Sequence, residues 1–247
     1  GDVSSAKDPE LFDEEEDDEV FSERILYEDN HLLIVNKRCG ELVQGDETGD
    51  PTLGDLVKEY LRVTYDKQGN IYLGIPHRLD RPTSGAVVLA KTEKALIRMN
   101  TLFREDKVDK TYWAIVDRIP PEIEGRMVDN LVKDGRTNKS RVVPADSKKG
   151  KRAVLSYRHR ASSRNFHLLE ITLETGRHHQ IRAQLAARNI HIRGDLKYGY
   201  PRSNRDGGIS LHARTLSFIH PVRQERITIV APVPDDPLWK VFEGMIE

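Results

Sequence analysis

The chain has 247 residues, 37% of them hydrophobic, which allows one large domain or two small ones with a sizeable core. Its single cysteine, Cys39, excludes an internal disulfide framework and any site built from several thiolates, and no run of about 18 apolar residues suggests a membrane span. Residues 1–30 hold thirteen acidic and two basic side chains, a net charge of −11. Because the whole chain has a net charge of −1, the remaining residues carry a net charge of +10. A basic body of this kind points to a polyanion such as nucleic acid, and we expect a cytoplasmic protein without a membrane partner.

Residues 1–22 are expected to form an acidic, disordered tail, because the like charges repel and few side chains are apolar. Such a tail either only solvates the chain or competes with a nucleic acid for the basic body. From Ile25 the pattern changes, and HLLIVN (31–36) predicts a buried strand. The next segment, 52–63, predicts an amphipathic helix whose core face would carry Leu53, Leu56, Val57 and Tyr60.

The middle of the chain continues this alternation of strands and helices. GAVVLAK (85–91) predicts a buried strand, and Thr92 is placed to cap a helix over 93–106. KTYWAIV (110–116) predicts a further strand. The polar stretch 133–152 contains eight Lys and Arg residues and predicts a solvated hairpin or loop.

The last third of the chain is rich in strands. Strands are predicted over 153–160, 166–174, 209–219 and 226–232, and helices over 178–188 and near the C-terminus. Strands outnumber helices, and hairpin spacing is mixed with crossover connections. The pattern therefore indicates a single α+β domain built on a mixed sheet.

HRLDRPTSGAVVLAKT (77–92) carries the first candidate chemistry. It places Asp80 between Arg78 and Arg81 in a turn that leads into the predicted strand. An aspartate in a turn usually makes local hydrogen bonds. A carboxylate beside a buried strand would however tend to protonate unless a cation offset its desolvation, so the neighbouring arginines are consistent with a functional, ionised group.

Two more polar stretches adjoin apolar elements. KTYWAIV presents Tyr112 within a strand, and LETGRHHQIRAQLA (173–186) continues from a strand through a tight turn into a helix. Arg182 on that helix lies next to the core-facing positions and is expected at the edge of the core. His178 and His179 are adjacent and would point in different directions on a helix, and spacings typical of metal ligands are absent, so we expect no metal site.

Together these stretches resemble the RluA-type family of RNA pseudouridine synthases. HRLDRPTSG is similar to the family signature H-R-L-D-x-x-T-S-G, KTYWAIV to its tyrosine-bearing strand, and TGRHHQIR to its T-G-R-x-H-Q-I-R segment. GDLKYG (194–199) and LHARTLSFIHP (211–221) match later family segments in the same order, so the resemblance covers roughly residues 26–232. One departure is NKRCG (36–40), where the family usually has N-K-P-x-G; without the proline this turn is less constrained.

The resemblance implies a single pseudouridine-synthase-like catalytic domain over residues 23–247, with a mixed, mostly antiparallel sheet, flanking helices and a central RNA-binding cleft. It implies an isomerase that converts specific uridines of structured RNA, either ribosomal RNA or tRNA, to pseudouridine. Neither a cofactor nor a metal is implied, and a monomer suffices. No separate N-terminal RNA-binding module, such as many relatives carry, is expected ahead of residue 23.

The family motifs also imply a role for single residues. Asp80 would be the catalytic aspartate, acting as nucleophile or base, and Tyr112 the tyrosine that lies against the target base. Arg182 would pair with the aspartate, and Arg78 would fill the space left by the flipped base. The remaining predicted RNA-binding residues are His77, Arg81 and Arg177.

Two alternatives remain open from the sequence. The first is an RNA-binding protein of the same fold that has lost catalysis, which RNA binding without turnover would reveal. The second is a hydrolase in which Asp80 works with another carboxylate, since glycosidases also react at C1′. Glu174 is the carboxylate within the polar stretches that this alternative would use. Release of free uracil would identify it.

Overall fold

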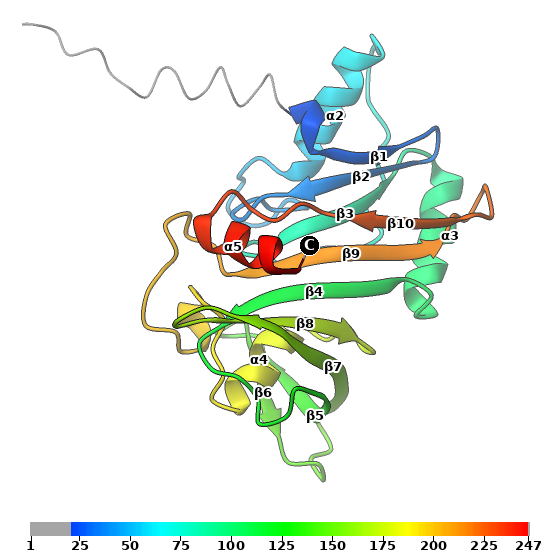
Figure 1. Ribbon diagram of the computed structural model, residues 1–247. Helices are drawn as coiled ribbons and strands as arrows, with labels where there is room; N and C mark the ends of the chain where they lie inside the picture. The colour runs from blue at the N-terminus through cyan, green and yellow to red at the C-terminus, as the bar shows by residue number, and fades with distance from the viewer. Residues whose placement is uncertain (1–20, 247) are drawn as a thin grey trace, which may run out of the picture.

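The computed structural model describes residues 21–246, which form one ten-stranded sheet with four α-helices (Figure 1). Most of the acidic tail predicted over residues 1–22 lies outside the described residues. Phe21 is the first described residue; it begins the 3-10 helix η2 (Phe21–Arg24), and its ring packs against Tyr60 with the centroids 5.9 Å apart. None of the described helices is long and apolar enough to cross a membrane.

The strands run in the spatial order β1-β2-β3-β9-β4-β8-β7-β5-β6, and β10 pairs with β9. All pairs are antiparallel except β3 with β9, so the sheet is mixed and mostly antiparallel, as expected. The bounds are β1 (Ile25–Glu28), β2 (Leu32–Lys37), β3 (Ser84–Ala90), β4 (Asp109–Val116), β5 (Glu124–Asp134), β6 (Lys139–Val143), β7 (Lys151–Ser162), β8 (His167–Leu173), β9 (Leu211–Ile219) and β10 (Arg226–Val230).

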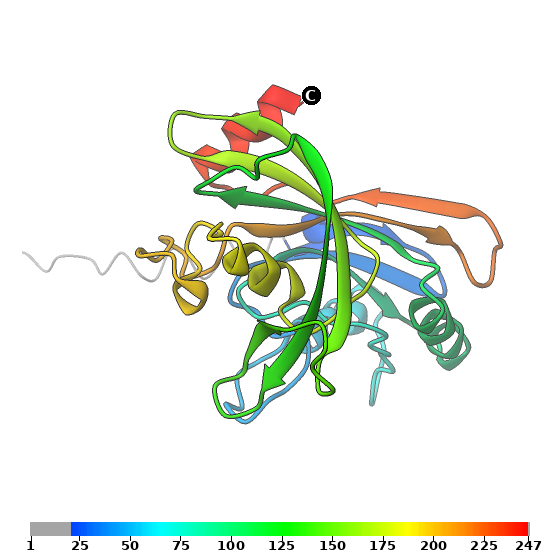
Figure 2. The same cartoon turned by 90° about the horizontal axis from the view of Figure 1, so that it is seen from below.

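The sheet is strongly twisted, and its two halves carry separate cores. In Figure 2 the green strands β5 and β7 cross the direction of the orange strands β9 and β10 steeply. One core lies among β4, β5, β7, β8 and the helix α4 (Gln180–Ala187), and two others lie on the faces of β2 and β3. Tyr112 on β4 packs against cores of both halves. The junction between the halves is therefore where β4 and β9 run side by side.

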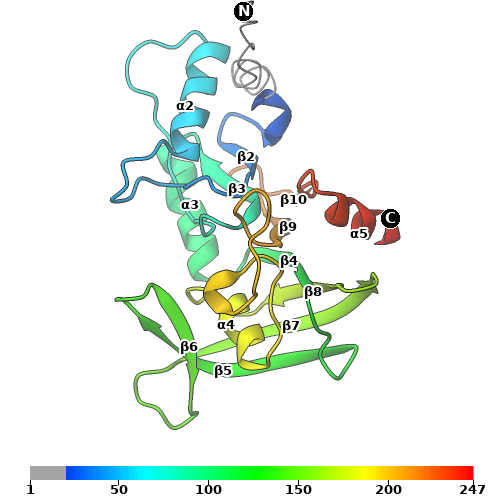
Figure 3. The ribbon, with the colours of Figure 1, turned by 90° about the vertical axis from the view of Figure 1, so that its left-hand side faces the viewer.

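Four helices cover the sheet. α2 (Leu53–Thr64) packs on the face of β2 and β3 that carries Leu33 and Val87, and α3 (Glu93–Arg104) packs on the opposite face, against Leu32 and Val88. α5 (Pro237–Ile246) packs against Trp113 and Ile115 of β4, and Figure 3 shows it apart from α2 and α3. Thr52 caps α2 in a capping box with Asp55, and Thr92 caps α3 by accepting a hydrogen bond from the N–H of Ala95. The predicted cap and start of α3 are thus confirmed.

Gly85 allows the backbones of β3 and β9 to approach closely. Its φ is +123°, and a Cβ at this position would lie 2.4 Å from the backbone N and O of Ala213 on β9. Only a residue without a side chain fits such a contact. The parallel pairing of β3 with β9 is limited to Ser84 with His212 and Gly85 with Ala213. This short contact places the turn before β3 next to β4 and β9.

Some predicted elements differ from the structure. The helix predicted over 178–188 begins only at Gln180, because His179 adopts a left-handed φ of 52°. Leu56, predicted to face the core, is 40% exposed, and Leu61 is buried instead. Strand β5 was not predicted, because its burial does not follow a regular alternation. The polar stretch 133–152 does form a hairpin and loop, made of the end of β5, β6 and the connection to β7.

Candidate active site

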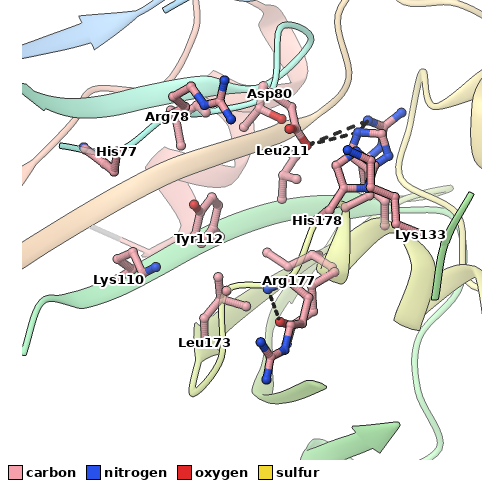
Figure 4. Close-up of a pocket in the computed structure, with 17 residues that line it drawn as sticks. His77, Arg78, Asp80, Lys110, Tyr112, Lys133, Leu173, Arg177, His178 and Leu211 are labelled. Atoms are coloured by element: carbon pink, nitrogen blue, oxygen red, sulfur yellow. Dashed lines mark hydrogen bonds and ion pairs between the residues drawn. The ribbon is translucent and has the colours of Figure 1, made fainter. Parts of the chain in front are cut away.

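A cavity of about 460 Å³ opens at the junction between the two halves of the sheet. It is lined by the turn before β3, by β4, by the end of β5, by the β8–α4 connection and α4, and by the start of β9 (Figure 4). Asp80, Tyr112 and Arg182, which are far apart in the sequence, all face it. Its volume falls in the range typical of small-ligand pockets.

The backbone of the turn that carries Asp80 is fixed by hydrogen bonds from the buried side chain of Lys37. The N–H of Thr83 donates to the carbonyl of Asp80 at 2.9 Å. Lys37 is 1% exposed, and its Nζ donates to the carbonyls of Arg81 at 3.0 Å and Thr83 at 2.5 Å. Burial lowers the pKa of Lys37 to about 8. The Asp80 side chain itself is 38% exposed, so a well-held backbone presents a carboxylate that is open to the cavity.

Arg182 is held mainly by a second aspartate. Its Nε and Nη2 each lie 2.8 Å from one carboxylate oxygen of Asp195, and both residues are buried. This bidentate pair leaves Nη1, which donates to Nε2 of His179 at 3.3 Å and lies 4.0 Å from Oδ2 of Asp80. The guanidinium also stacks 4.8 Å from the ring centroid of Tyr198. Arg182 is thus a fixed cation that faces Asp80 across a long ion pair.

Asp195 was not predicted as a site residue. It lies in GDLKYG, which matched the family, but the match gave no role to single residues. A fully buried aspartate needs a cation. That argument could not be made before the structure, since the sequence does not say that Asp195 is buried.

His179 is a second group beside Asp80 that the sequence did not identify. Its Nε2 lies 3.5 Å from Oδ2 of Asp80, and its Nδ1 lies 2.8 Å from the hydroxyl of Tyr198. Burial and then the charge of Arg182 lower the pKa of His179 to about 3, so the ring is neutral at pH 7. Among the residues that the structure describes, no three His, Cys, Asp or Glu side chains are grouped to hold a metal ion.

Tyr112 occupies the centre of the cavity wall. On β4 it pairs with Ile171 of β8 and with Ala213 of β9, next to an irregularity in the β4–β9 register. Burial raises the pKa of its hydroxyl, and the charge of Asp80 adds to the effect, so the phenol stays protonated. Leu173 and Leu211 provide apolar lining around it (Figure 4).

His77 and Arg78, both predicted to bind RNA, line the cavity in different ways. Arg78 is exposed. The Nε2 of His77 accepts a hydrogen bond from the N–H of Val88 at 2.9 Å, and its ring stacks on Phe103 with the centroids 4.4 Å apart. Burial lowers the pKa of His77 to about 3. The contacts of His77 therefore anchor the Asp80 turn to β3 and α3.

Arg177 lies at the rim of the cavity, where its Nε donates to the carbonyl of Arg152 at 2.8 Å. Arg81 turns away from the cavity. Its guanidinium donates to the carbonyl of Gly40 at 2.9 Å and to Asp50 at 2.8 Å. The two arginines beside Asp80 in the sequence do not form a cage around it, because successive turn residues point to different sides. The cation that faces the carboxylate is Arg182.

Asp80 is the single carboxylate among the described residues that line the cavity. Glu174, the second carboxylate that a hydrolase would need, is outside the lining and is bound by Arg126 at 2.6 Å. Lys110 and Lys133 also line the cavity. The cavity is therefore suited to an anionic ligand and offers one group for nucleophilic or base chemistry.

The turn NKRCG keeps its place despite the missing proline. The N–H of Arg38, which proline would lack, donates to Oε1 of Glu41 at 2.8 Å. The N–H of Gly40 donates to the carbonyl of Arg81 at 2.8 Å. A hydrogen bond thus takes the place of the ring constraint, and the turn remains attached to the Asp80 segment.

Comparisons with known proteins agree with the motifs. The family model described as RNA pseudouridylate synthase matches residues 31–187. An uncharacterized RNA pseudouridine synthase of Synechocystis sp. is 40% identical over 218 residues, which cover 85% of this chain and 65% of the relative. The ribosomal large subunit pseudouridine synthase C of Buchnera aphidicola is 34% identical over 221 residues, which cover 87% and 68%. The chain thus spans about two thirds of the length of these relatives.

The fold has a counterpart among solved structures. The human RNA pseudouridylate synthase domain containing 4 superposes with a TM-score of 0.75 at 24% identity, and the match covers 96% of this chain and 97% of that one. At this level of identity the likeness shows the shared fold, in agreement with the predicted α+β class.

Proposed function

The chain belongs to the RluA-type RNA pseudouridine synthase family, and from that membership we propose that residues 23–247 act as a catalytic domain that isomerises specific uridines of structured RNA to pseudouridine. The observation that carries the proposal is the position of Asp80, the single carboxylate in the cavity lining, opposite the fixed cation Arg182 and beside the ring of Tyr112.

The proposed reaction breaks the N1–C1′ glycosidic bond of uridine and forms a C5–C1′ bond. The proton on C5 leaves and N1 gains a proton, so the product has the same atoms as the substrate and no oxidant or reductant takes part. The step requires one ionised carboxylate beside the ribose, as nucleophile or as base. Asp80 is assigned this role because it is open to the cavity and faces the buried cation Arg182.

Tyr112 is assigned to the uracil ring. Its aromatic face lines the cavity, and stacking of a base on an aromatic ring contributes about 1–3 kcal/mol. Its raised pKa keeps the hydroxyl protonated, which favours the stacking role over a role as the base that removes the C5 proton.

A uridine inside a stem reaches Asp80 only after it is flipped out, at a cost of a few kcal/mol for lost stacking. Arg78 is exposed at the mouth of the cavity, on the same turn as Asp80. A guanidinium can stack in the vacated position and recover part of that cost. We assign Arg78 to this position, and Arg177 at the rim to the neighbouring phosphates.

Ribosomal RNA and tRNA are both candidate substrates, and the name of the Buchnera relative favours the large ribosomal subunit as the first RNA to test. Both RNAs occur in the cytoplasm, which we therefore propose as the location of the protein. We propose that a monomer carries out the reaction, since Asp80, Tyr112 and Arg182 of the same chain line the cavity.

The test is tritium release from [5-³H]uridine-labelled ribosomal RNA and tRNA. We expect release by the wild type and a loss of about 10²- to 10⁴-fold or more in Asp80→Asn, which keeps the shape of the side chain but not the charge. Glu174→Gln, a surface carboxylate outside the cavity, is the matched control and should match the wild type.

Three outcomes would overturn parts of the proposal. Equal release by Asp80→Asn and the wild type would remove the role of Asp80. RNA binding without release on both RNAs would favour a binding protein that has lost catalysis. Free uracil among the products would identify a hydrolase.

A further inference from the structure

Lys110 lies on β4 two residues before Tyr112, and both residues line the cavity. Its amine is 5.9 Å from the ring centroid of Phe103, and a Cβ at Gly176 would lie 3.4 Å from it. Within the part of the chain that the structure describes, this amine makes no hydrogen bond or ion pair. Burial lowers the pKa of Lys110, and the more distant charge of Asp106 opposes that shift. Lys110 therefore has a half-buried amine whose hydrogen-bond donors are available to a ligand.

The position of Lys110 relative to Asp80 suggests which part of a ligand it meets. Figure 4 shows Tyr112 between Asp80 and Lys110. Two residues along a strand advance about 7 Å, which is comparable with the length of a pyrimidine ring and its carbonyl oxygen. A uracil that stacks on Tyr112 with its ribose at Asp80 would therefore direct the opposite end of its ring at Lys110.

Uracil has a carbonyl at that end both before and after isomerisation. In uridine the ring atom opposite the N1–C1′ bond is C4, which carries O4. In pseudouridine the bond starts from C5, and the ring atom opposite is C2, which carries O2. This holds whether the base turns over or rotates in its own plane. A donor placed beyond the far edge of the base can therefore bind a carbonyl oxygen of the substrate and of the product from one position.

The same carbonyl carries negative charge during the reaction. When the N1–C1′ bond breaks, its electron pair stays with the uracil, and the charge spreads over N1, O2 and O4. C5 then bonds to C1′, the proton on C5 leaves and N1 gains a proton, so Lys110 keeps its own proton throughout. A fixed cation at the far carbonyl stabilises this charge where it develops, in a cavity where the interaction is stronger than in water.

We propose that Lys110 is a catalytic residue whose Nζ donates a hydrogen bond to the uracil carbonyl opposite the glycosidic bond, O4 in uridine and O2 in pseudouridine, and stabilises the uracil anion formed between them. The inference rests on the proposed isomerase function and adds a polar contact to the stacking of the base on Tyr112. Lys133, the other lysine of the lining, is exposed at the end of β5 and is suited to a phosphate instead.

The first experiment compares Lys110→Met with Lys107→Met by tritium release and by the salt dependence of RNA affinity. Methionine keeps the apolar stem of lysine without the amine, and Lys107 is an exposed lysine outside the cavity lining. We expect Lys110→Met to lower kcat about 10²- to 10³-fold with RNA affinity within about twofold, and Lys107→Met to match the wild type. A Lys110→Met protein with the wild-type kcat and a salt slope lower by about 0.7–0.9 would show a phosphate contact and overturn the proposal.

Replacing O4 of the substrate by sulfur tests the contact with the base directly. The substrate is a synthetic fragment of the RNA that releases tritium, with the mapped target uridine replaced by 4-thiouridine, whose sulfur is a weaker hydrogen-bond acceptor than oxygen. Because the contact is then already weakened, Lys110→Met should slow the reaction about fivefold less, or better, on 4-thiouridine than on uridine. Chromatography of the nucleosides measures the product. Equal slowing on both substrates would mean that Lys110 does not contact O4.

Urea unfolding separates a catalytic role from a packing role. An amine that is half-buried without an ion-pair partner does not stabilise the fold, so the unfolding midpoint of Lys110→Met should equal or exceed that of the wild type. A lowered midpoint would mean that the lysine packs the cavity wall and would contradict the inference. If the wild type releases no tritium, the proposed function fails. If the wild type is active and Lys110→Met releases tritium as fast as Lys107→Met, only this inference fails.

Discussion

The cation that faces Asp80 is Arg182, and a different carboxylate, that of Asp195, holds this cation in place. Arg182 makes its two short hydrogen bonds to Asp195 and approaches Asp80 only with its remaining nitrogen. A buried arginine without a partner would cost several kcal/mol, and Asp195 removes that cost whatever happens to Asp80. In the proposed reaction, Arg182 would therefore stay in place even when Asp80 becomes bonded to the substrate and loses its charge.

Burial also lowers the pKa of His212, and the pH dependence of the free energy of unfolding tests this effect. It is fully buried between Ser84, whose Oγ lies 2.7 Å from Nδ1, and Ala231, whose carbonyl lies 3.0 Å from Nε2. Burial lowers its pKa to about 4. Between pH 6.5 and pH 4 the unfolded chain binds this proton and the folded protein does not, so the free energy of unfolding falls as the pH falls through that window.

The expected loss from this one histidine is about 2 kcal/mol between pH 7 and pH 5. Urea unfolding of the wild type and of His212→Gln at both pH values measures it. Because glutamine does not titrate, the variant should lose about 2 kcal/mol less than the wild type over the same interval. Identical losses would show that folding does not lower the pKa of His212.

At the scale of elements, the contact of β3 with β9 holds the site together. The Asp80 turn leads into β3, Tyr112 is on β4, and β9 lies between these two strands. Gly85 lets the backbones of β3 and β9 approach closely enough for this arrangement. The site therefore depends on one glycine that is five residues from Asp80 in sequence and is not itself among the residues that line the cavity.

Gly85→Ala tests that dependence. The added methyl group would lie 2.4 Å from backbone atoms of Ala213, and a φ of +123° is unfavourable for alanine, so we expect a loss of about 3 kcal/mol or more in the free energy of unfolding. Gly45→Ala, where nothing lies within 4 Å of the new Cβ, is the control. Urea midpoints measure both. A Gly85→Ala protein as stable as the control would mean that β3 and β9 are further apart.

At the scale of the whole molecule, the distribution of charge predicts where the proposed RNA substrate binds. The chain beyond residue 30 carries +10, and the β5–β6 hairpin with the loop that follows it contributes many of these charges. That hairpin is fixed to the site, because Ser140 on β6 hydrogen-bonds both His178 and Tyr198. Lys133 at the end of β5 lines the cavity itself. In the proposed reaction, the RNA around the target uridine should therefore lie along this hairpin.

The salt dependence of RNA affinity measures that contact. Each phosphate neutralised adds about 0.7–0.9 to the slope of log Kd against log salt, so removing three exposed charges of the hairpin and its loop should lower the slope by about 2. The variant carries Arg136→Gln, Lys148→Gln and Lys149→Gln. Its control carries Lys107→Gln, Arg226→Gln and Lys240→Gln, exposed charges outside the hairpin and the cavity, and should keep the wild-type slope. Equal slopes would place the RNA on another face.

The sequence by itself predicted most of the elements and the candidate site residues. Hydrophobic patterning and the cap at Thr92 predicted β2, β3, β4 and α3 close to their observed bounds, since these depend on neighbours along the chain. The family motifs identified Asp80, Tyr112, Arg78 and Arg182, all of which line one cavity. Strand β5 and the outward face of Leu56 were missed, because burial depends on what packs from elsewhere in the chain.

The tertiary structure alone decided how these groups are paired. Arg182 meets Asp195 thirteen residues away, His179 meets Asp80 ninety-nine residues away, and Arg81 turns to Asp50 instead of the cavity. Each of these contacts depends on the direction of a side chain and on how segments apart in the sequence are brought together. Local sequence preferences fix neither, because a turn residue can point to either side and a partner distant in sequence becomes available only after the sheet has formed.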